Sequence, residues 1–153
     1  MHRIPIAARF LCLVSLALLA PRASTPQGTF DTLYATNHKF YGELDLFLSI
    51  PGHTANLGLV DVGAGLAAAP APWLKASLDY HDFRAVEADG AGEKRFGAEL
   101  DAKLAFTGIE RLSVAVLYGV FLPDRAIRMP RRLAADAHLA REHWVFVTVD
   151  MQL

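Results

Sequence analysis

Acidic and basic side chains alternate along two stretches of the chain at a spacing that could support acid–base chemistry. Asp79, Glu99 and Asp101 are carboxylates in this pattern that could be interpreted as paired. Basic residues alternate with them in the same stretches, at Lys75, Arg95 and Lys103. Neighbouring carboxylates can exchange protons with a substrate. Their alternation with bases instead favours a salt-bridged wall that faces water.

Histidines and cysteine do not form a catalytic or metal-binding pattern. His81 and Asp82 are neighbours on an expected strand, so their side chains point to opposite faces and cannot form a dyad by themselves. His138 and His143 lie five positions apart in an expected loop, which is not a useful ligand spacing. Cys12 is the single cysteine, which excludes a disulfide and a cysteine-based metal site. We therefore predict no enzymatic activity, no metal site and no cofactor.

The element that would position the charges is Arg95–Phe106, in which apolar and polar residues alternate. One strand face would carry Phe96, Ala98, Leu100, Ala102, Leu104 and Phe106. The other face would carry Arg95, Gly97, Glu99, Asp101, Lys103 and Ala105. Because side chains alternate across a strand, this stretch has one apolar and one mostly charged face. Its length is close to the roughly 9–11 residues with which a tilted strand crosses a bilayer.

The same alternation recurs and predicts six strands. They are Lys39–Ile50, Gly58–Ala69, Trp73–Arg84, Arg95–Phe106, Leu112–Leu122 and His143–Leu153. In the fifth, Leu117 and Phe121 break the alternation. Short turns near Ala69–Pro72 and Thr107–Arg111 alternate with the longer connections Pro51–Leu57, Val86–Lys94 and Pro123–Glu142. Outer-membrane barrels have short periplasmic turns and longer outer loops. The sequence therefore predicts an all-β, antiparallel up-and-down meander that forms a partial outer-membrane β-barrel.

The N-terminus has the character of a secretory signal. Arg3 and Arg9 form a basic region directly before the apolar run Phe10–Ala20. This run is too short to span a membrane. Ala23 is a small residue at a plausible cleavage position, and cleavage after Ala20 is the alternative site. A short buried N-terminal helix is the structural alternative. We predict a signal peptide at 1–23, a lead-in segment at 24–38 and the barrel-like part at 39–153.

One stretch has a distinctive amino-acid sequence. Phe30–Phe47 reads FDTLYATNHKFYGELDLF and resembles the FDTLYPTNHKFYG-x-x-DLF segment of the alginate-export family of outer-membrane β-barrels. Later segments resemble segments of that family in the same order: Ser77–Arg84, Phe96–Phe106, Leu112–Asp124 and His143–Leu153. The chain departs from the family in length, holding only the C-terminal part of its larger barrel. It also has Ala35 in place of a proline and Leu153 in place of a final phenylalanine.

The resemblance implies passive movement of an anionic exopolysaccharide, such as alginate, along basic side chains of a barrel lumen. Candidate lumen residues are Lys75, Arg84, Arg95 and Lys103. Rings of basic side chains select anions by attraction at close range. Candidate anion contacts in the outer loop are Arg125, Arg128, Arg131 and Arg132. For that loop, contact with lipopolysaccharide and simple solvation are the alternatives.

These observations predict a porin-like protein of the Gram-negative outer membrane, a truncated member of its family. Its expected partners are outer-membrane lipid, lipopolysaccharide and an anionic polysaccharide, while a net charge of −1 gives no sign of nucleic-acid binding. Six strands are fewer than the about eight of the smallest common barrels. Further chains would then complete the barrel, or the product is a non-functional remnant. The alternative of another class is a secreted soluble β-meander or half-barrel that binds a ligand.

Overall fold

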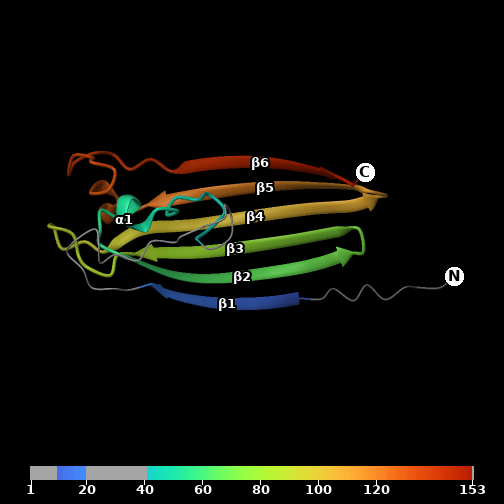
Figure 1. Cartoon of the computed structure of the whole chain (residues 1–153), viewed down its shortest axis with the longest axis horizontal. Coiled ribbons are helices and arrows are strands. Elements are labelled where there is room, and N and C mark those ends of the chain that lie inside the picture. The colour runs from blue at the N-terminus through green and yellow to red at the C-terminus, as the bar shows by residue number, and fades with distance from the viewer. Residues whose placement is uncertain (1–9, 20–40, 153) are drawn as a thin grey trace.

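The computed structural model describes residues 10–19 and 41–152 and shows one antiparallel sheet of six strands (Figure 1). The strands are β1 Phe10–Leu19, β2 Leu59–Ala71, β3 Leu74–Arg84, β4 Arg95–Ile109, β5 Leu112–Pro123 and β6 Glu142–Met151. Each strand pairs with the next one along the chain, in the order β1-β2-β3-β4-β5-β6. This confirms the predicted all-β meander. In the described part of the chain, no helix has the length and apolarity needed to cross a membrane.

Short and long connections alternate at the two ends of the sheet. Tight turns join β2 to β3 and β4 to β5 at one end, which we call the turn end. The longer connections lie at the opposite end, the loop end, together with helix α1 (Ile50–His53) and the 3-10 helix η2 (Arg125–Arg128) (Figure 1). The expectation that Pro70 ends a strand is wrong. β2 continues to Ala71, because a register shift between Ala68 and Ala71 accommodates the proline.

The prediction of a first strand at Lys39–Ile50 is also wrong for the part that the structure describes, which begins at Tyr41. From Tyr41 onward the chain forms turns and then α1. Gly42 and Asp45 adopt positive φ values of 78° and 56°, which interrupt an extended conformation. The buried hydrophobic side chains of this stretch stand three apart rather than two: Tyr41, Leu44, Phe47 and Ile50. We call residues 41–58 the inner segment, because it packs on one face of the sheet.

The sixth strand comes instead from the apolar run of the expected signal. β1 pairs with β2 from Phe10 opposite Ala68 to Leu19 opposite Leu59. The signal peptide stays a prediction. We expect mass spectrometry of the exported protein to find a mature N-terminus at Ser24, so that β1 is removed. A product from a membrane fraction that still begins at Met1 would contradict this cleavage.

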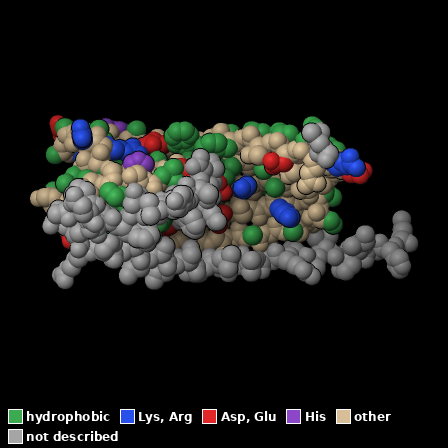
Figure 2. All heavy atoms as spheres, in the orientation of Figure 1, with side chains coloured by type: hydrophobic (Ala, Val, Ile, Leu, Met, Phe, Trp, Pro, Cys, Tyr) green, Lys and Arg blue, Asp and Glu red, His purple; other side chains and the backbone are tan. Residues whose placement is uncertain are grey.

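The two faces of the sheet have opposite chemical character. One face, the apolar face, exposes large hydrophobic side chains from β2 to β6: Val62, Leu66, Leu78, Tyr80, Leu100, Leu104, Val116, Tyr118, Leu122, Val145, Val147 and Val149. Cross-strand register aligns them in rows, so that Leu66 lies opposite Leu78 and Tyr118 lies opposite Val145. The inner segment packs on the reverse, the polar face, which Figure 2 shows with its charged side chains in blue and red.

A small hydrophobic core lies between the inner segment and the loop end of the polar face. Phe47 is fully buried there, with ring centroids 4.7 Å from Phe83 and 5.5 Å from Phe96. Phe121 and Leu117 are buried and belong to the same face. These two residues break the sequence alternation because the polar face is apolar where the inner segment and its neighbouring loops cover it.

A β-bulge in β4 brings Phe96 into this core. Phe83 lies opposite Gly97, whereas Arg84 lies opposite Arg95, so Phe96 is the extra residue. Phe96 is completely buried, and Arg95 is carried to the opposite face. The strict alternation expected for Arg95–Phe106 is therefore correct from Ala98 onward and wrong for Arg95 and Phe96.

Candidate functional site

The polar face carries a row of carboxylates surrounded by small residues. Asp79 lies opposite Gly65 on one side and Asp101 on the other, and Asp101 lies opposite Gly119. A Cβ atom at Gly65 would collide with Asp79 Oδ1, and one at Gly119 would come within 2.7 Å of Asp101 Oδ1. The glycines thus give the carboxylates room on the polar face of the sheet.

The inner segment is fixed to this row by its backbone. Leu44 N–H donates to Glu99 Oε1 at 2.9 Å, and Glu43 N–H donates to Asp101 Oδ2 at 3.2 Å. Glu99 and Asp101 are 0% and 1% exposed. These two hydrogen bonds attach the backbone of the inner segment to β4.

His81 finds its partner on another strand. Its Nδ1 lies 2.9 Å from Asp61 Oδ2 of β2, and its ring stacks on Phe83 with centroids 5.7 Å apart. The neighbouring Asp82 points to the opposite face, as the sequence predicted. Burial, and next the charge of Asp61, raises the pKa of Tyr41 in the inner segment.

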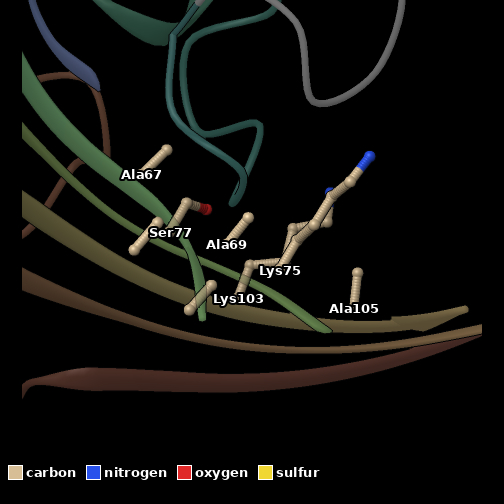
Figure 3. A pocket seen from close by; sticks show the side chains of 8 residues that line it. Ala67, Ala69, Lys75, Ser77, Lys103 and Ala105 are labelled. Atoms are coloured by element: carbon tan, nitrogen blue, oxygen red, sulfur yellow. The ribbon is translucent and has the colours of Figure 1, made fainter. Parts of the chain in front are cut away.

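Two of the four candidate lumen residues come together toward the turn end. Lys75 of β3 and Lys103 of β4 line a hollow of about 360 Å³ whose floor is formed by small side chains (Figure 3). Ala67, Ala69, Ser77 and Ala105 are among the other residues that line it. Lys75 is exposed, and Lys103 Nζ lies 3.5 Å from Glu43 Oε1 of the inner segment. Two ammonium groups over a floor without bulky side chains can accept an anion.

The other two candidates, Arg84 and Arg95, lie at the loop end on the apolar face. Both contact Asp82, with Arg84 Nε at 2.5 Å from Oδ2 and Arg95 Nε at 2.6 Å from Oδ1. Arg95 Nη1 also reaches Asp124 at 3.2 Å. The register places Asp82 opposite Val62, which is exposed on the apolar face. Arg84 and Arg95 thus form an ion-pair cluster at the rim and do not join the two lysines.

The outer-loop arginines mostly bind other parts of the chain. Arg125 Nη1 contacts Glu93 Oε1 at 3.0 Å, and Arg128 Nη2 donates to the carbonyl oxygen of Ala137 at 3.1 Å. Arg131 forms an ion pair with Glu142 and also lies 5.7 Å from the centre of the Phe121 ring. Arg132 is exposed and has a φ of 55°. Three of the four guanidinium groups therefore have partners within the chain.

Within the residues that the structure describes, no three histidine, cysteine, aspartate or glutamate side chains come together as metal ligands.

The chain matches no family model, no curated protein and no solved structure. Its resemblance to the alginate-export family stays a prediction from the segments quoted above.

Proposed function

We propose that the chain is an outer-membrane protein related to the alginate-export porins, with strands that cross the bilayer and a polar face that contacts an anionic polysaccharide. The inverted burial of the sheet carries this proposal. Leu100 is 39% exposed, whereas its neighbours Glu99 and Asp101 are buried beneath the inner segment. In a water-soluble protein the apolar face of such a sheet is usually buried in the core, and the charged face is exposed to water.

The extent of the apolar face supports a hydrocarbon environment. Soluble monomers rarely expose contiguous apolar patches larger than a few hundred Å². Here such side chains follow one another across β2 to β6. Trp73 and Phe106 pair at the turn end, with ring centroids 5.6 Å apart. Tyr118 and His143 pair on β5 and β6, nearer the loop end. Aromatic residues near strand ends are typical of membrane barrels, where they contact the lipid interface.

A direct test compares membrane association with solubility. We expect the exported chain to sediment with outer membranes and to resist extraction by alkaline carbonate. The open edge of the sheet favours a second candidate, a secreted half-barrel. An unpaired strand edge is costly in lipid, because its backbone N–H and C=O groups have no hydrogen-bond partner there. Recovery of the chain as a soluble periplasmic protein would support that candidate and reject ours.

Conductance gives a further expected result. The sheet has six strands, or five once residues 1–23 are removed as predicted. Both numbers are lower than the about eight of the smallest common barrels, so the isolated chain should form no stable pore. We expect planar bilayers with the purified chain to show no reproducible conductance steps. Regular anion-selective steps would contradict this expectation and would mean that the sheet closes.

The lysine hollow should bind anionic sugars. We expect Lys75→Met combined with Lys103→Met to weaken binding of trigalacturonate, by up to about fivefold per lysine, since exposed ion pairs contribute at most about 1 kcal/mol each. Calorimetric titration of the chain refolded in detergent measures this. Lys94→Met is the matched control, because Lys94 lies at the loop end and donates to the Val86 carbonyl. Neutral maltotriose should not distinguish the variants.

A further inference from the structure

The inner segment reaches the lysine hollow through one residue. Glu43 is attached to β4 twice: its backbone N–H donates to Asp101 Oδ2 at 3.2 Å, and its carboxylate Oε1 lies 3.5 Å from Lys103 Nζ. Lys103 is also one of the two basic residues that line the hollow. In Figure 3 the loop of the inner segment passes above this part of the sheet. A carboxylate of the chain itself therefore lies beside the proposed anion site.

The residues that follow Glu43 in the chain hold its backbone in position. The next residue, Leu44, is buried and donates its N–H to Glu99, and Phe47 fills the aromatic core. The contact between Glu43 and Lys103 is nevertheless open to solvent, because the two side chains are 24% and 43% exposed. The hydrogen bonds from the N–H groups of Glu43 and Leu44 thus fix the backbone, while the ion pair between the Glu43 side chain and Lys103 is partly exposed.

We propose that Glu43 is an internal competitor for the anion site. Its carboxylate occupies the side of Lys103 that a uronate carboxylate would contact, and an incoming anion exchanges with it. Both are carboxylates, so the exchange replaces one ion pair by another of the same kind. Lys75, which is exposed, contacts the ligand first. This inference rests on the proposed function, because it needs an anionic ligand at the hollow.

Titration of the refolded full-length chain with trigalacturonate tests the proposal. Glu43→Gln should bind the probe about two- to fivefold more tightly than the native chain, the range expected for loss of one partly exposed ion pair. Glu87→Gln is the matched control, since Glu87 is exposed in the loop between β3 and β4 and should change nothing. Glu43→Asp keeps the charge on a shorter side chain and should stay close to native.

A double variant makes the mechanism specific. If Glu43 acts through Lys103, Glu43→Gln should have no effect in a Lys103→Met background. Unchanged or weaker binding by Glu43→Gln with a native urea midpoint would overturn the competitor role. The competitor role would also be overturned if Glu43→Gln still tightened trigalacturonate binding in the Lys103→Met background.

The same titration separates this inference from the proposed function. If neither the native chain nor Glu43→Gln prefers trigalacturonate to maltotriose, the anion site itself is rejected. If native binding depends on Lys103 but not on Glu43, the anion site stands and the competitor is rejected. Binding that appears only in Glu43→Gln would support both.

Discussion

Replacing Val116 by arginine is expected to destabilise the membrane-inserted sheet by about 2–4 kcal/mol, the cost of a cation near the bilayer midplane of a β-barrel. Val116 is 43% exposed in the middle of the apolar face, opposite Leu104 on β4 and Val147 on β6. Urea titration of the chain folded in liposomes measures the change. The yield of protein recovered in the outer-membrane fraction should fall in parallel.

Its neighbour provides the control. Ala115 is half-buried and faces the polar side, opposite Ala105 and Thr148, so an arginine there can reach water. Ala115→Arg should cost far less than Val116→Arg. In a soluble half-barrel Val116→Arg should also have only a small effect, because an exposed surface substitution is usually within about 0.5 kcal/mol of neutral. Equal, small effects of the two variants would therefore reject the membrane proposal.

Truncation of Phe47 to alanine is expected to cost about 3–5 kcal/mol and to release the inner segment, because large-to-small changes in a packed core lose both burial and packing. The side chain is fully buried and contacts the rings of Phe83 and Phe96. Urea titration should show the loss of stability. Limited proteolysis should show new cleavage between residues 41 and 58.

Phe47→Leu is the matched variant, since a hydrophobic replacement of nearly similar size keeps most of the burial. It should retain the native protease resistance. If Phe47→Ala were as resistant as the native chain, the backbone anchors at Glu99 and Asp101 would hold the segment without the aromatic core.

The strands β2 to β6 could be predicted because each carries its own two-residue period. In β4, for example, Leu100, Ala102 and Leu104 face one side and Glu99 and Asp101 the other, as the alternation requires. The inner segment was missed because Leu44, Leu46 and Leu48 mimic a strand period. Its three-residue burial period and the turn at Gly42 become clear only when the sheet that it covers is present.

The site was predictable to the extent that neighbours in sequence define it. Lys75 and Lys103 share a face and were placed correctly on the polar side. Arg95 was placed on the wrong face, because a bulge shifts the register by one residue. The alternation of residue types in the sequence does not reveal that bulge. Contacts between distant residues were likewise out of reach. The pairing of His81 with Asp61, and of Glu43 with Lys103, depends on strand register and on how the inner segment folds back.

The directions of the two edge strands decide what can complete this sheet. β1 and β6 stand at opposite ends of an even-numbered antiparallel order, so they run in opposite directions. Copies inserted with the same orientation can then place β6 of one copy antiparallel to β1 of the next and close a ring about the membrane normal. Removal of residues 1–23 leaves β2 as the edge, and β2 runs in the same direction as β6. If the leader is cleaved as predicted, a sheet whose two edges can pair antiparallel with each other becomes one whose antiparallel completion needs a strand from elsewhere.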